Sequence, residues 1–203
     1  LHRDLRRQRQ MCIRDSLSAA QLAEVDTYTD DELAARAVTT ADLRWSDRGL
    51  LSGVLDGHRS ELAPVLGYGM SADRHHLPPI NGAHGFSVEW LRLPAGSTTG
   101  AHLSTDTQVV IPVTGDWEIV FNHGGDEISR RPARESVVSV PPCVWRDFGN
   151  VGDGPATAIV VNGSSGPTRL RWSSEIEDAA RSAGYAIDAG GHVAPLDVLG
   201  GPR

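Results

Sequence analysis

The chain contains no lysine, only two cysteines and no long apolar run. All 19 basic residues are arginine, which excludes a Schiff-base lysine and the lysine of a P-loop. Cys12 and Cys143 form no CxxC pair and cannot make a disulfide framework, which favours a reducing compartment. No segment has the pattern of a membrane span or a signal peptide. We therefore expect a cytoplasmic protein without a membrane partner.

Positive charge is scarce as well. The formal net charge is −7, and no basic stripe follows the first few residues, so we expect no nucleic-acid partner.

Glycine (22) and proline (12) are abundant, which favours a turn-rich all-β protein over a helical bundle. A length of 203 residues suffices for one domain with a sizeable core and some extensions.

Changes in composition divide the chain into four predicted parts. The first part contains a Met-Cys-Ile-Arg-Asp sequence that resembles a translated sequencing adaptor, so we expect a read-through artefact or a disordered basic arm. Capping boxes predict one helix starting at Thr29–Glu32 and another at Ser174–Glu177. The parts are the artefact or arm at 1–16, a helical linker at 17–45, a β-barrel at 46–172 with its core at 86–162, and a C-terminal helix and tail at 173–203.

The barrel region has a β pattern. Phe86, Val88 and Trp90 alternate with Ser87 and Glu89, which is the period-two pattern of a half-buried strand. About eight short strands at such spacing predict a sandwich or small barrel. The further strand candidates are 107–114, 116–122, 127–131, 136–140, 145–148, 157–162 and 168–172, and two short apolar pieces, 50–55 and 62–66, precede them.

One stretch carries glycines and polar residues at regular spacing. Gly96 and Gly115 enclose His102, Ser104 and Gln108 in the pattern G-x5-H-x-S-x3-Q-x6-G. This resembles the first motif of the cupin superfamily (RmlC-like, double-stranded β-helix proteins), G-x5-H-x-H-x3-E-x6-G, with the second histidine and the glutamate replaced. The resemblance implies an all-β fold: a cupin-type jelly-roll barrel with short N- and C-terminal helices.

A second stretch lies in register with the second cupin motif, G-x5-P-x-G-x2-H-x3-N. The corresponding residues are Glu135, Pro141, Cys143, Arg146 and Asn150. The proline and the asparagine match, whereas both glycines and the histidine are replaced. The resemblance covers residues 86–162 and implies the fold more firmly than an activity.

The resemblance also implies a metal site, whose four ligand positions hold His102, Ser104, Gln108 and Arg146. A divalent metal needs three or four nitrogen, oxygen or sulfur ligands, and an arginine cation in their midst repels it. We therefore expect no metal cofactor. The alternative is a divalent Fe, Mn, Ni or Zn at His102 and Gln108, completed by histidines of the preceding segment: His75, His76 and His84.

An arginine inside the barrel predicts a pocket for a small anionic molecule. Arg146 would anchor a carboxylate or phosphate, because a guanidinium matches both groups with two parallel hydrogen bonds. Gln108 and Ser104 would orient the molecule, and His102 would be the catalytic acid or base. Trp117 and Phe148 would form pocket walls. Alternatively, Arg146 pairs internally with Glu89, Asp106 or Asp147. The resemblance to metal-free cupin isomerases and epimerases also implies a carboxylate partner for His102, for which Asp106 is the candidate.

Three functions stay open at this point, and the sequence does not decide whether the protein is an enzyme. The first is a cupin-domain protein that binds a small anionic organic molecule and has a degenerate metal site. The second is a metal-dependent dioxygenase or isomerase with an altered ligand set. The third is the structural half of a two-cupin protein with another cupin domain upstream. Because cupins commonly pair through their sheets, we expect a homodimer.

Overall fold

The computed structural model describes residues 27–82, 85–164 and 166–199, so the predicted artefact or arm at 1–16 lies outside the described residues. The chain forms two compact units, Leu1–Ala37 and Val38–Arg203. Among the described residues, no helix is both long and apolar enough to cross a membrane.

The first unit contains the short helix α3 (Asp30–Ala34). Its N-cap is Thr29, whose hydroxyl accepts a hydrogen bond from the Glu32 amide, while the Glu32 carboxylate accepts one from the Thr29 amide. This exchange satisfies two amides that the first helical turn leaves without partners. The predicted capping box is confirmed.

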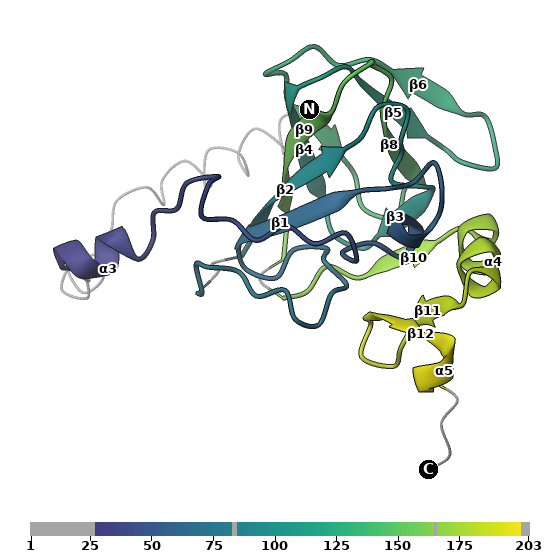
Figure 1. Cartoon of the computed structure of the whole chain (residues 1–203). Helices are drawn as coiled ribbons and strands as arrows, with labels where there is room; N and C mark the ends of the chain where they lie inside the picture. The colour runs from purple at the N-terminus through teal and green to yellow at the C-terminus, as the bar shows by residue number, and fades with distance from the viewer. Residues whose placement is uncertain (1–26, 83–84, 165, 200–203) are drawn as a thin grey trace, which may run out of the picture. The chain divides into compact units, whose positions relative to one another are not determined.

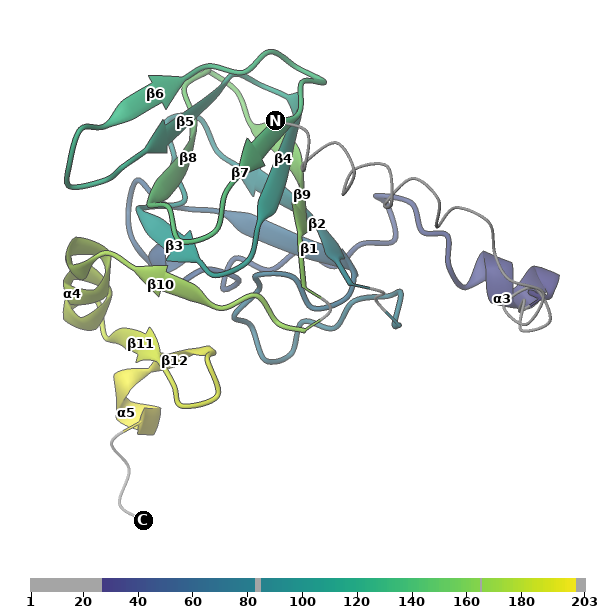
Figure 2. The same ribbon diagram turned by 180° about the vertical axis from the view of Figure 1, so that it is seen from behind.

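The second unit is built from two five-stranded antiparallel sheets (Figures 1 and 2). Neighbouring strands are mostly distant in sequence, which is the topology of a jelly-roll barrel. The predicted all-β double-stranded β-helix is confirmed. In spatial order, one sheet contains β1 (Glu61–Leu66), β2 (Ser87–Leu93), β9 (Ala156–Asn162), β4 (Gln108–Thr114) and β7 (Val138–Val140), and the other contains β10 (Leu170–Trp172), β3 (His102–Ser104), β8 (Arg146–Asn150), β5 (Trp117–Phe121) and β6 (Ile128–Arg130).

The hydrophobic core takes side chains from both sheets. Leu91 and Val110 come from the first sheet and Ile119 and Phe148 from the second, and all four are buried. Buried and half-buried residues alternate along β2, β4 and β9, as expected where one face of a sheet is covered. Of the two apolar pieces before the barrel, one forms the edge strand β1 and the other forms the 3₁₀ helix η2 (Leu51–Val54).

All four glycine positions of the two motifs have a left-handed backbone. Gly96 and Gly115 have φ values of 68° and 77°, and Glu135 and Cys143, which replace the other two glycines, have 62° and 58°. A residue with a Cβ adopts this region at a cost of roughly 1–2 kcal/mol. At Gly115 a Cβ would also lie 2.3 Å from the Cβ of Ala156. The chain therefore retains the turns of both motifs even where the glycine is lost.

The C-terminal region follows β10. Helix α4 (Ser174–Ser182) begins at the N-cap Ser173, whose hydroxyl accepts from the Ile176 amide, so the predicted capping box at Ser174–Glu177 is wrong by one residue. Ser173 has the extended backbone of an N-cap, which places the apolar Ile176 at the third helical position, where it packs into the core. Beyond α4, the predicted tail forms three short elements: β11 (Tyr185–Ile187), β12 (Val193–Pro195) and α5 (Leu196–Leu199).

We expect Glu135→Gly to stabilise the protein. The Glu135 side chain is exposed, and its amide hydrogen bond to the Pro112 carbonyl (2.7 Å) does not need a side chain. Glycine relieves the strain of the left-handed backbone, but it also increases the conformational entropy of the unfolded chain. The difference raises the free energy of unfolding by about 0.5–1 kcal/mol. Urea unfolding monitored by tryptophan fluorescence measures it. Gly115→Ala is the matched control and should lower the midpoint, and an unchanged or lower midpoint for Glu135→Gly would contradict the prediction.

Candidate functional site

Buried polar side chains face the barrel interior from both sheets. On the second sheet, the strand register places Trp172, His102 and Arg146 side by side on β10, β3 and β8. On the first sheet, it places Asn162 opposite Gln108 on β9 and β4. Residues directly opposite on antiparallel strands point to the same face, so strand pairing assembles this site from four distant parts of the chain.

The guanidinium of Arg146 joins the two sheets and is fully buried, with 0% of the residue exposed. Its Nε and Nη2 donate to Gln108 Oε1 (3.0 and 2.7 Å), and its Nη1 donates to the Val144 carbonyl (2.9 Å). Burial lowers the pKa of Arg146 to about 10, which leaves it charged at neutral pH. A guanidinium has five N–H donors, and the described residues supply acceptors for three of them.

The expected internal ion pair of Arg146 is not formed within the described part of the chain. The Asp147 carboxylate accepts hydrogen bonds from Thr98 Oγ1 (2.9 Å) and Thr99 Oγ1 (3.1 Å) instead. Asp106 accepts from Thr168 Oγ1 (2.9 Å) and acts on Arg146 only as a more distant charge. The buried cation is therefore held by carbonyl oxygens, which do not neutralise it.

His102 is also fully buried, and it is neutral. Its Nδ1 lies 2.8 Å from the Gly100 carbonyl, which can only accept, so Nδ1 carries the proton and Nε2 has a free lone pair. Nε2 has no hydrogen-bond partner among the described residues. Burial, and then the charge of Arg146, lower the pKa of His102 to about 3. The ring packs against Phe148 and Trp172, with both centroid distances 5.4 Å.

A chain of hydrogen bonds leads from Arg146 to a buried carboxyl group. Gln108 Nε2 donates to Asn162 Oδ1 (2.8 Å), and Asn162 Nδ2 donates to Glu89 Oε1 (2.9 Å). The Met70 amide donates to both Glu89 oxygens (3.0 and 3.2 Å). Burial raises the pKa of Glu89 to about 7 despite these hydrogen bonds.

The position of Glu89 could not be taken from its local pattern. The alternation along 86–90 is confirmed, but the buried face is the polar one: Ser87 and Glu89 are fully buried, whereas Val88 and Trp90 are half-buried and Phe86 is exposed. Such a pattern usually places the apolar side chains in the core. Here the Asn162 amide of β9 donates to both Ser87 Oγ (3.3 Å) and Glu89 Oε1 (2.9 Å), which accounts for the inward orientation of these two polar residues.

Two other expected residues have local roles. Ser104 is buried, and its hydroxyl accepts from the Asp106 amide (3.0 Å). Trp117 lies opposite Asn150, four residues along β8 from Arg146, or about 13 Å at the usual rise of a strand. The structure therefore does not bring Trp117 to the site. Trp172, which the sequence did not single out, contacts His102 instead.

The side chains present do not fit the metal that the fold family implies. His102 Nε2 is one donor, but Gln108 Oε1 already accepts two hydrogen bonds from Arg146, and Ser104 Oγ accepts one from the main chain. Within the described residues no group of three or more His, Cys, Asp or Glu side chains could hold a metal ion. His76 Nε2 contacts the Arg44 carbonyl and His75 is exposed, while His84 lies outside the described residues.

A small cavity lies outside the inner site. Its volume is about 40 Å³, and Met70, Thr168 and Trp172 contribute to its walls. Met70 Sδ accepts a hydrogen bond from Gln108 Nε2 (3.6 Å), and Trp172 packs on His102, so two side chains of the cavity wall also contact the inner site. The volume suits a few water molecules.

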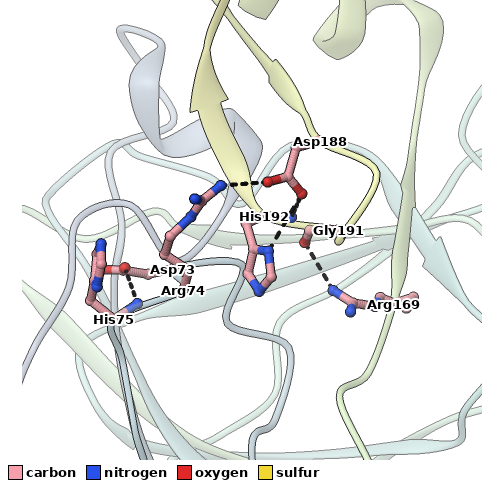
Figure 3. Close-up of polar contacts among 7 residues, drawn as sticks. All are labelled: Asp73, Arg74, His75, Arg169, Asp188, Gly191 and His192. Carbon is pink, nitrogen blue, oxygen red and sulfur yellow. Dashed lines mark hydrogen bonds and ion pairs between the residues drawn. The ribbon is translucent and has the colours of Figure 1, made fainter. Parts of the chain in front are cut away.

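The turn between β11 and β12 contributes another wall of this cavity, through Gly191. Figure 3 shows two polar contacts that fix this turn: Arg169 donates to the Gly191 carbonyl (2.9 Å), and Arg74 pairs with Asp188. The Val193 amide also donates to the Ala72 carbonyl (2.9 Å). The C-terminal hairpin thus contributes Ile187 and Gly191 to the cavity wall and is held by these polar contacts and by Val193, which packs against the core.

No family profile and no curated protein match the chain. Solved structures do match it. Peruvianin-I, a cysteine peptidase from Thevetia peruviana latex, matches with a TM-score of 0.51 and 17% identity over 72% of this chain and 80% of that one. A recombinant oxalate oxidase in complex with glycolate matches with a TM-score of 0.47 and 16% identity over 78% and 73%. The Cnp3 cupin domain of Schizosaccharomyces pombe matches with a TM-score of 0.45 and 11% identity over 63% and 73%.

At such identities the likeness concerns the fold alone. The topology and the left-handed turns at all four motif glycine positions agree with it. The chain carries a cupin-fold domain, as the two motifs predict.

We expect Glu89→Gln to reduce the dependence of stability on pH. Because burial raises the folded pKa of Glu89 from 4.5 to about 7, the folded state retains a proton that the unfolded state releases between these pH values. The free energy of unfolding of the wild type therefore falls as pH rises through this window, by on the order of 3 kcal/mol from this group.

Urea unfolding at several pH values measures this effect as the difference between wild type and Glu89→Gln. Burial also raises the pKa of Asp147, but that group is present in both proteins and cancels. Parallel stability profiles for the two proteins would refute a buried, titrating Glu89.

Proposed function

We propose that this cupin-fold domain binds a small 2-hydroxy carboxylate inside the barrel without a metal ion. The observation that carries this proposal is a complementary pair of unused groups. Arg146 has two N–H donors without an acceptor among the described residues, and the neighbouring His102 has an unpartnered Nε2 lone pair.

The chemistry of these two groups selects the ligand. A buried polar group without a partner costs about 1–3 kcal/mol, so a molecule that satisfies both groups gains that free energy on binding. A carboxylate accepts hydrogen bonds from guanidinium N–H donors. Because His102 Nε2 carries no proton, it needs a donor, and the hydroxyl of a 2-hydroxy acid supplies one.

Binding is better supported than turnover. With a pKa of about 3, His102 is a weak base at neutral pH, and it makes no hydrogen bond to a carboxylate in the described part of the chain. Only one of the four metal-ligand positions of the motifs, His102, keeps a strong metal ligand. This disfavours the alternative of a metal-dependent dioxygenase or isomerase. We therefore propose that His102 is a recognition residue.

The first test compares glycolate with acetate by calorimetry, because glycolate is the smallest carboxylate with a 2-hydroxyl and acetate lacks only that group. We expect glycolate to bind the wild type at least about tenfold more tightly, the equivalent of one hydrogen bond. His102→Phe, an apolar ring of similar shape between Phe148 and Trp172, should remove that preference. Arg146→Met should weaken both ligands. Equal affinities in the wild type would rule out the role of His102.

The second test restores the metal ligands of the motifs. We expect the variant Ser104→His, Gln108→Glu, Arg146→His to bind about one zinc ion per chain, because two new histidines and one glutamate join His102 and the cation is lost. Metal analysis after dialysis against zinc measures this, with the wild type as the control. Stoichiometric Fe, Mn, Ni or Zn in the wild type would overturn the metal-free assignment.

A further inference from the structure

Glu89 is a buried carboxyl group without a neighbouring cation. It has 0% exposure, and no arginine or histidine of the described residues lies within ion-pair distance of it. Its carboxyl group packs against the backbone of Gly69, where an added Cβ would lie 2.5 Å from Oε2. A carboxylate in this position keeps its charge only at a considerable desolvation cost.

The two amides between Glu89 and Arg146 have only one consistent orientation. Arginine only donates, so Gln108 must turn its oxygen toward Arg146 and its NH₂ toward Asn162. Asn162 must then turn its oxygen toward Gln108 and its NH₂ toward Glu89. All donors in the chain point from the cation to the carboxyl group, and hydrogen bonds aligned in this way polarise one another.

The immediate surroundings of Glu89 carry no charge. Pro64 on β1 and Val160 on β9 lie opposite it, and the turn at 69–70 presents a main-chain amide. On β2 itself, Arg92 pairs with Glu61 at the half-exposed face.

The charged and titratable groups of the interior are therefore few. Arg146 lies two amides away from Glu89, and His102 is neutral beside Arg146. Cys143 and the partly buried Asp106 act electrostatically on Arg146. Asp147, the residue after Arg146, is held by the hydroxyls of Thr98 and Thr99. Glu89 and Arg146 thus stand at the two ends of one hydrogen-bond chain, with Gln108 and Asn162 between them.

We infer that Glu89 makes the anion site proton-coupled: a carboxylate that binds at Arg146 enters together with one proton, which Glu89 takes up. This inference rests on the proposed function. A bound carboxylate brings a second negative charge into an interior with one cation, and an uncompensated buried charge is costly. Protonation of Glu89 restores neutrality, and no bond other than the new O–H is formed.

Calorimetry of glycolate with the wild type tests the inference, in two amine buffers of different ionisation enthalpy that contain no competing anion. We expect uptake of about one proton per glycolate at about pH 8, declining toward zero near pH 5, and about a tenfold loss of affinity per pH unit above pH 7. Glu89→Gln should bind glycolate without proton uptake and with little pH dependence. Tight binding to the wild type at pH 8 with no proton uptake would overturn the coupling.

A second measurement does not need a ligand. The ¹³C resonance of the Glu89 carboxyl group, assigned by its loss in Glu89→Gln, reports its titration midpoint. We expect the midpoint to rise by about one pH unit or more in Arg146→Met and to change little in Arg146→Lys, which keeps the charge. An unchanged midpoint in a folded Arg146→Met variant would overturn the coupling even if glycolate binds. A raised midpoint without glycolate binding supports the coupling and refutes the hydroxy-acid function.

Discussion

The hydrogen bonds between the Arg146 guanidinium and the Gln108 carbonyl oxygen are the contact on which the interior of this barrel depends. They join the two sheets and hold a cation that water cannot reach. They also dictate which way both amides of the polar chain must turn, and so they deliver a donor to Glu89. A buried charge held only by carbonyl dipoles is not neutralised, and the proposed anion binding rests on this.

The interior of this barrel differs from a metal-binding cupin site in where the positive charge comes from. In such a site a dication would occupy the space among four ligands, whereas here the side chain of Arg146 brings a fixed positive charge. The retained histidine then has nothing to coordinate, and its Nε2 has no partner among the described residues. The imidazole without a partner and the guanidinium without a counter-charge lie side by side, and in the proposed function one small ligand satisfies both.

Several features were accessible from the residues alone, and others were not. The spacing of Gly96 and Gly115, the alternating strands and the Thr29–Glu32 capping box all reflect local geometry, and each prediction holds. The inward orientation of Glu89 does not follow from the alternation, which gives a period but not a phase where part of the core is polar, and the sequence named Glu89 only as one possible ion-pair partner of Arg146. Trp172 was missed because it lies in β10, some 70 residues after His102, and only strand pairing brings the two together.

The left-handed turns explain why the two motifs predict the fold. A left-handed backbone is required at four places, and the chain adopts it even at Glu135 and Cys143, so the fold can be recognised after two glycines are lost. The partner of each buried charge cannot be predicted from local turn geometry. Whether Arg146 meets a carboxylate, an amide or a ligand depends on strand register across two sheets and on the exclusion of water between them. These conditions arise only when the barrel closes, because hydrogen-bond strength and charge compensation depend on the surroundings of a group and not on its place in the chain.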